Sequence, residues 1–80
     1  INGVEASFVA VDNGAHVSVS ARSMGDVNVQ VIMEKLGGGG HLTMAGAQLR
    51  NASLEEAKRR LLDAISEYRE SQRTEKQKNS

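Results

Sequence analysis

Leu36-Gly37-Gly38-Gly39-Gly40-His41-Leu42-Thr43-Met44-Ala45-Gly46 is the stretch that decides how this chain folds. Four consecutive glycines lose more conformational freedom on folding than any other residues do. A flexible linker is the ordinary explanation, but this run is short, ends in His41, and joins a patterned helix to a segment with strand character. We interpret it as a loop whose bare backbone amides can approach and bind phosphate oxygens. It lacks the Lys-Ser/Thr pair of a P-loop.

The residues before the glycines predict a short amphipathic helix. One helical stripe, at spacing i, i+3, i+4 and i+7, is formed by Val29, Ile32, Met33 and Leu36. Asp26 or Asn28 can cap its start, and Gly37 is expected to end it as the C′ residue.

Further toward the N-terminus the pattern changes to a β-hairpin. Residues 6–11 form a short apolar run rich in strand formers, and apolar residues on both faces predict a strand covered on both sides. Asp12-Asn13-Gly14 is a turn signal. Residues 16–22 then alternate between an apolar and a polar face.

Beyond the glycines we expect a weak strand over residues 45–49 and then a longer helix. Ser53 and Glu56 have the spacing of a capping box. The apolar stripe of this helix consists of Leu54, Ala57, Leu61, Ile65 and Tyr68, and its predicted i, i+4 ion pairs are Glu55 with Arg59 and Glu56 with Arg60.

The predicted fold is a small α/β domain. It has a mixed sheet with an N-terminal β-hairpin, a short helix leading into a glycine-rich loop, and a longer C-terminal helix. The domain is expected to cover residues 1–70. Residues 71–80 contain no apolar residue and are expected to form a frayed or disordered tail.

Composition narrows the possible functions. The chain has 80 residues, 39% of them apolar, with ten basic and ten acidic side chains and no cysteine. It therefore forms one domain without disulfides or thiolate metal ligands. It shows no membrane span and no targeting signal, and it begins with Ile1, so we expect a piece of a longer protein. Residues 1–49 hold two basic and four acidic groups, so each cation there merits attention.

Two side chains are candidates for binding chemistry. Arg22 lies at the end of the polar face of the second strand, near Ser20. Its guanidinium can form two hydrogen bonds to a phosphate, or it can be an ordinary solvated surface charge. His41 can donate to a phosphate or a base, or it can be a capping or core histidine. Met24 and Met44 flank glycines. We expect their side chains to fill gaps in the packing rather than to line a slot for adenine. No residues show the spacing of metal ligands.

Ser20-Ala21-Arg22-Ser23, a short helix, and then the glycine–histidine run together resemble the DHH-associated domain, the C-terminal substrate-binding half of DHH-family phosphoesterases. The resemblance extends from about Phe8 to Tyr68, with Met44 in place of a usual alanine. Within the family, residues 32–36 and 41–43 are most similar to the C-terminal end of cyclic-di-AMP phosphodiesterases of the GdpP type.

This resemblance implies a division of labour. A separate DHH domain would bind two manganese ions and hydrolyse cyclic-di-AMP to the linear dinucleotide, while the present domain grips the nucleotide. It assigns ligand contacts to Gly38, Gly39, Gly40 and His41, with Ser20 and Arg22 beside them. The Asp-His-His motif is absent from the sequence, so no catalytic residue and no cofactor is expected in this chain, which should not be catalytic alone.

The resemblance implies three partners: a cyclic dinucleotide or short oligonucleotide, the DHH domain of the same polypeptide, and a second copy in a homodimer. The whole enzyme would be membrane-anchored with its catalytic part on the cytoplasmic face, and this fragment soluble. Two alternatives stay open: the same module in an oligoribonuclease or single-strand exonuclease, or a structural or dimerisation module. Neutral charge and only two aromatic residues, Phe8 and Tyr68, disfavour a long-strand nuclease.

Overall fold

The computed structural model describes residues 5–79, and side-chain surroundings are described for residues 5–73. In chain order the elements are β1 (Ala6–Asp12), β2 (His16–Ser23), α1 (Val29–Glu34), β3 (Gly39–Gly40), β4 (Met44–Arg50) and α2 (Leu54–Asn79). The predicted hairpin, short helix and long C-terminal helix are confirmed. The last two glycines, expected in a loop, instead form β3.

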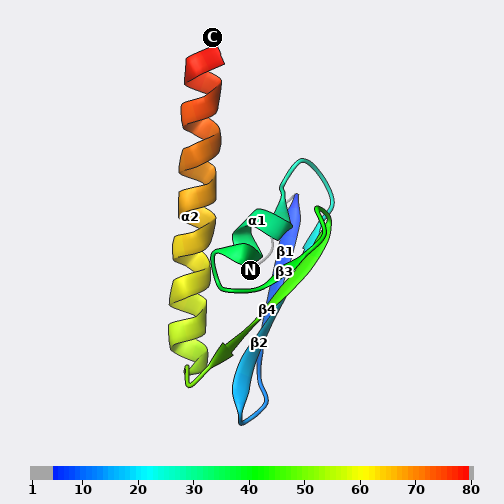
Figure 1. The fold of residues 1–80 in the computed structure, drawn as a ribbon, viewed down its shortest axis with the longest axis vertical. Coiled ribbons are helices and arrows are strands. Elements are labelled where there is room, and N and C mark those ends of the chain that lie inside the picture. Colours follow the sequence, from blue (N-terminus) through cyan, green and yellow to red (C-terminus); the bar gives the residue numbers. More distant parts are fainter. Residues whose placement is uncertain (1–4, 80) are drawn as a thin grey trace.

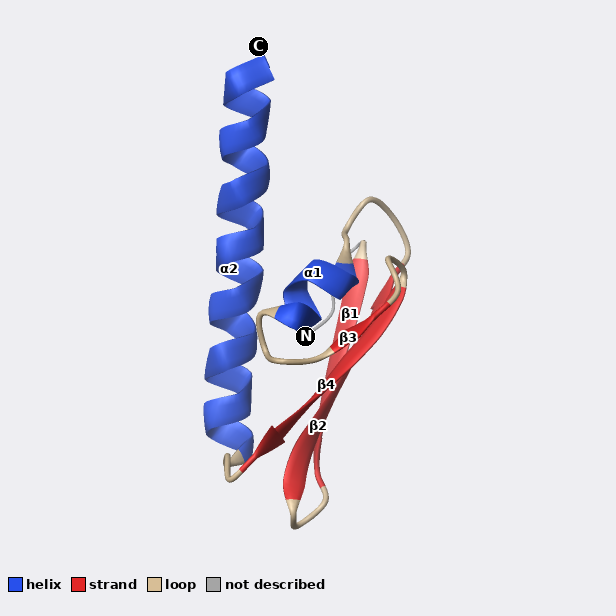
Figure 2. Cartoon of the chain, viewed as in Figure 1, coloured by secondary structure: helices blue, strands red, loops and turns tan. Residues whose placement is uncertain are grey.

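The four strands form one sheet in the order β1-β2-β4-β3, and every neighbouring pair is antiparallel. Both helices lie on the same side of this sheet (Figure 1, Figure 2), and both pack against its strands. The domain therefore has two layers, and no described helix covers the other face of the sheet. We call this uncovered side the open face.

The core lies between the sheet and the helices. Val17 and Val19 of β2 alternate inward and are 0% and 2% exposed, and from the helices Met33 and Ala57 are fully buried. Burial of this apolar surface drives the packing at roughly 25 cal/mol per Å². This packing also holds α1 in place, which is needed because the β-branched residues of α1 slightly lower its helix propensity.

The open face explains why one prediction about β1 is wrong. Val9 and Val11 are 58% and 53% exposed, although their apolar character predicted a strand covered on both sides. Their neighbours Phe8 and Ala6 point into the core. Strand alternation sends the two valines to the side that has no helix.

The ends of α1 are fixed by local hydrogen bonds. Asn28, not Asp26, is the cap, since its Oδ1 accepts from the Val31 N–H at 3.3 Å. The helix itself ends at Glu34, and Gly37 takes the left-handed conformation expected of a C′ residue, with φ +84°. The Gly37 N–H donates to the Glu34 carbonyl at 3.0 Å and the Gly38 N–H to the Met33 carbonyl at 2.9 Å. These two bonds make a Schellman motif.

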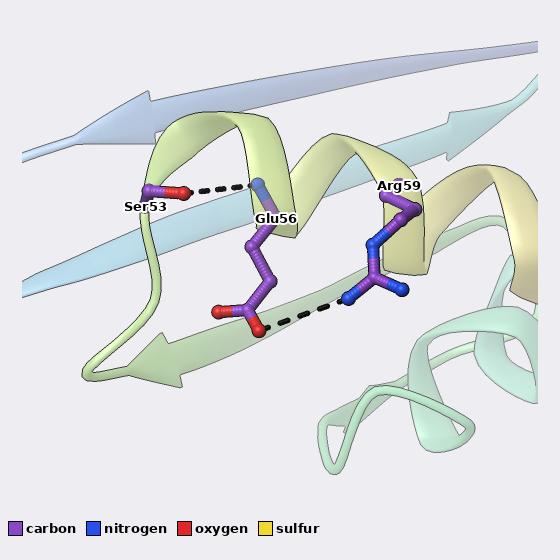
Figure 3. A network of polar contacts seen from close by, with 3 residues as sticks. All are labelled: Ser53, Glu56 and Arg59. Carbon is purple, nitrogen blue, oxygen red and sulfur yellow. Dashed lines mark hydrogen bonds and ion pairs between the residues drawn. The ribbon is translucent and has the colours of Figure 1, made fainter.

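At the start of α2 the predicted cap is partly correct. The Ser53 Oγ accepts from the Glu56 N–H at 3.1 Å (Figure 3). The Glu56 carboxylate, expected to pair with Arg60, instead lies 3.8 Å from the guanidinium of Arg59 at i, i+3. Glu55 forms no ion pair with Arg59 either. Both partners of the observed pair are exposed, so several rotamers have similar energies and spacing alone does not select one.

The helix α2 continues to Asn79, through residues 71–79 where the sequence predicts a frayed tail. The domain boundary expected after residue 70 stays a prediction. Of the helices in residues 5–79, neither has the length and apolar composition needed to cross a membrane.

One hydrogen bond ties the two helices together. The Asn28 N–H donates to the Oη of Tyr68 at 2.9 Å, and Tyr68 is only 9% exposed. Tyr68→Phe should lower the free energy of unfolding by about 1–2 kcal/mol, because it leaves a part-buried amide without its acceptor. Thermal denaturation followed by circular dichroism measures this as a loss of several degrees. Ser20→Ala, which removes an exposed hydroxyl, is the control, and equal melting of the two variants would contradict the assignment.

Candidate functional site

The glycine run brings the end of α1 back onto the sheet. Gly37 and Gly38 complete the helix end, and β3 then pairs with β4 through Gly39 opposite Gly46 and Gly40 opposite Ala45. The small side chains of β4 leave room for this approach.

Two of these glycines are required by packing. A Cβ on Gly38 would lie 2.6 Å from the Cβ of Ala47 and would also collide with the Gly46 carbonyl oxygen. A Cβ on Gly40 would lie 2.7 Å from the Cβ of Ala45, and its φ of +147° already disfavours other residues. The fold alone therefore explains Gly38 and Gly40.

Gly39 is different from its neighbours. No atom outside its chain neighbours lies within 4 Å of the position a Cβ would take there. Its φ is also outside the left-handed region. Across the sheet it lies in line with Gly46 and Ser20. We call Ser20, Gly46 and Gly39 the glycine floor, a strip of the open face with almost no side chain above the backbone.

The glycine floor forms part of an open groove of about 640 Å³. Polar lining is provided by Ser18, Ser20, Gln48 and Arg50, and backbone lining by Gly37, Gly38, Gly39 and Gly46. No carboxylate is among the residues that line this groove. The groove therefore offers hydrogen-bond donors and one positive charge to a ligand.

Arg22 and His41 lie just beyond the floor rather than in the groove lining. Arg22 is two residues after Ser20 on β2, on the same face, and pairs with Met44 across the sheet. The His41 N–H donates to the Met44 carbonyl at 2.7 Å, and the Met44 N–H returns a bond to the His41 carbonyl at 3.3 Å. Arg22, Met44 and His41 thus form one row across the strands beside the glycine floor.

The exposure of these side chains excludes a core role for His41 but leaves both interpretations of Arg22 open. His41 is exposed, so it is not a core histidine. Arg22 is exposed, and no carboxylate among residues 5–73 pairs with it. Met24 and Met44 are 68% and 54% exposed, so the prediction that they fill gaps is wrong.

The backbone amides play a smaller part than the loop interpretation predicted. The Gly38 N–H already donates to the end of α1. Because His41 and Met44 exchange both hydrogen bonds, ladder alternation turns the Gly40 N–H and C=O away from β4 toward the sheet edge. The glycine run therefore presents the Gly40 amide to a ligand at the sheet edge, rather than a cluster of four amides.

Ser23, the last residue of the Ser-Ala-Arg-Ser stretch, has a structural role. It is 7% exposed, its Oγ donates to the Gly25 carbonyl at 3.2 Å, and the Gly25 N–H donates back at 3.3 Å. These bonds shape the loop after β2 and leave Ser20 and Arg22 as the ligand candidates of that stretch.

The end of the groove that is lined by Gln48 and Arg50 was not expected from the sequence. Gly46, Gln48 and Arg50 are alternate residues of β4 and so share the open face. This alternation is visible in the sequence, but Arg50 lies one residue beyond residues 1–49, the part of the chain in which basic side chains are scarce. No three side chains within the described residues are placed to hold a metal ion.

Comparison with known proteins adds independent information. The model of the DHHA1 domain matches residues 1–71. Over 69 residues the chain is 58% identical to the cyclic-di-AMP phosphodiesterase GdpP of Geobacillus thermodenitrificans and 51% identical to the cyclic-di-AMP phosphodiesterase PdeA of Listeria monocytogenes. Each match covers 85% of this chain and 10% of the relative.

A further match concerns a differently named enzyme. The chain is 46% identical over 70 residues to the bifunctional oligoribonuclease and PAP phosphatase NrnA of Thermus thermophilus. That match covers 84% of the chain and 22% of the relative. The chain thus spans between a tenth and about a fifth of the length of these curated relatives.

Proposed function

Since this chain belongs to the DHHA1 domain family, whose model matches residues 1–71, we propose that it is the nucleotide-gripping part of a cyclic-di-AMP phosphodiesterase. The family resemblance read from the glycine–histidine motif is confirmed. The observation that carries the proposal is Gly39, a glycine that the fold does not need, facing open space on the same face of the sheet as the exposed cation of Arg22.

The geometry suits a nucleotide. A side-chain-free floor lets a sugar–phosphate unit come close to the backbone of β3 and β4. Arg22 can form two parallel hydrogen bonds to a phosphate, and the Ser20 hydroxyl can donate a further one. His41 is within the same cross-strand row and can donate to a phosphate or a base.

The residues of this chain position the ligand and offset its charge. We propose that the hydrolytic step belongs to a DHH domain elsewhere in the same polypeptide. Manganese bound there would supply the activated water. We further propose that the whole protein is anchored to a membrane with this part on the cytoplasmic side, and that it can form homodimers.

A second candidate function is supported by the match to NrnA, a relative named as an oligoribonuclease. In that case the same surface would hold the end of a short oligonucleotide. A purely structural or dimerisation role is less well supported. Such a role would explain Gly38 and Gly40, whose Cβ atoms would collide with β4, but not Gly39.

Titration of the ¹⁵N-labelled chain with cyclic-di-AMP, and separately with its linear product, tests the proposal. We expect amide shifts at Ser20, Arg22, Gly39 and His41 that saturate with ligand. Amides of α2, such as that of Arg60, are the internal control and should not move. Shifts confined to α2, or none at saturating ligand, would overturn the assignment, and shifts with the linear product only would favour the second candidate.

A further inference from the structure

The groove continues well past the glycine floor. From Gly46 it follows β4 through Gln48 to Arg50, with Ser18 of β2 directly opposite Gln48. None of the contacts proposed above uses this far half. It therefore has no assigned role, although it forms one continuous groove with the floor.

Arg50 gives the far half a positive character. It is exposed, and no acidic side chain of residues 5–73 forms an ion pair with it. His16, its partner across the sheet, has its ring nitrogen 3.1 Å from the side-chain amide of Asn13. Asp12 pairs with Val17 in the register, on the other face of the sheet, and its carboxylate accepts from the Gly14 N–H at 3.0 Å. The guanidinium thus keeps its donors for a ligand.

The spacing along β4 identifies the kind of ligand. Arg50 is four residues from Gly46, or about 13 Å at the rise of a strand. It is six residues from Met44, the partner of Arg22, or about 20 Å. Strand side chains stand roughly perpendicular to the sheet. Adjacent phosphates of one nucleic acid strand are much closer together than this, so the two arginines do not serve neighbouring phosphates.

We infer that Ser18, Gln48 and Arg50 form a second phosphate subsite, which binds a distal phosphate of a linear oligonucleotide longer than a dinucleotide. The inference rests on the proposed function, because it places the first nucleotide on the glycine floor. Hydroxyl, amide and guanidinium groups all donate to phosphate oxygens. No aromatic side chain lines the groove, so the subsite reads the backbone and tolerates any base.

The test compares ligand lengths in Arg50→Gln. Dissociation constants for the linear adenylate dinucleotide and tetranucleotide are measured by amide-shift titration of the chain, with Arg60→Gln of α2 as the matched control for lost charge. Arg50→Gln should weaken tetranucleotide binding about tenfold, as expected for one charged hydrogen-bonding partner, and leave dinucleotide binding unchanged. The dependence of log K on log salt for the tetranucleotide should become shallower by about 0.7, the value for one phosphate of a single strand.

Each other outcome has a distinct meaning. Equal losses for both lengths would overturn the subsite, since Arg50 would then act only through long-range charge, and so would no loss at either length. If Arg60→Gln lowers tetranucleotide affinity as much as Arg50→Gln does, the subsite also fails. If neither ligand moves the amides of the glycine floor in the unaltered chain, the proposed function fails first. A Gln48→Ala variant with the same length-dependent loss would support the subsite independently.

Discussion

Gly38→Ala is expected to lower the free energy of unfolding by about 3 kcal/mol, at the upper end of ordinary overpacking effects. The new methyl group would lie 2.7 Å from the Cα of Ala47 and would press on the backbone of β4. A flexible side chain could rotate away, but backbone atoms of a paired strand cannot. Equilibrium denaturation in urea measures the change as a lower midpoint with an unchanged slope.

Gly39→Ala is the matched control, one residue away with the same chemical change. Because no atom outside its chain neighbours lies within 4 Å of the new Cβ, stability should change by no more than about 1 kcal/mol, toward greater stability through the unfolded chain. Nucleotide affinity should nevertheless fall, since the methyl group stands on the glycine floor. Equal destabilisation by the two variants would contradict the distinction between packing and binding glycines.

Arg22→Gln is expected to weaken nucleotide binding by roughly 10- to 100-fold, the loss that corresponds to about 1.5–3 kcal/mol for a hydrogen bond to a charged group. Stability should be nearly unchanged, because the side chain is exposed and has no ion-pair partner among residues 5–73. The measurement is the dissociation constant for the linear dinucleotide, taken from the amide shifts of the floor.

Lys35→Gln is the control for Arg22→Gln. Lys35 lies in the helical layer, where its Nζ is 3.6 Å from the Glu67 carboxylate. Removing this exposed pair should change stability by less than about 1 kcal/mol and leave affinity unaltered. Similar affinity losses in both variants would show that net charge, rather than a direct contact from Arg22, governs binding.

Much of the fold is predictable because it depends on local sequence. The alternation of residues 16–22 places Val17 and Val19 in the core, and the helical stripe correctly identifies Met33 as buried. Gly37, the first residue after the stripe, is correctly expected to take the left-handed backbone of a C′ residue. The family resemblance groups Ser20, Arg22, Gly39 and His41 as ligand contacts, and β4 pairs with each of them: Ser20 and Gly39 lie opposite Gly46, and Arg22 and His41 pair with Met44.

The remaining features depend on partners distant in sequence. Gly39–Gly40 forms a strand only because β4 folds back beside it, and nothing in a run of glycines encodes that pairing. The exposure of Val9 follows from the placement of both helices on one face, which residues 6–11 alone do not specify. Arg50 joins the site through the register of β4 with β2, so its relation to Ser20 is visible only in three dimensions.

The contact between Tyr68 and Asn28 gives the molecule an intrinsic optical reporter. Tyr68 is the sole tyrosine and the chain has no tryptophan, so its ultraviolet fluorescence comes essentially from one ring. That ring sits where α2 meets the start of α1, in the layer opposite the glycine floor. Its emission should report the opening of the helical layer during unfolding while staying insensitive to nucleotides on the open face. Unfolding can then be followed by this emission, and ligand binding separately by the amide shifts of the ¹⁵N-labelled chain.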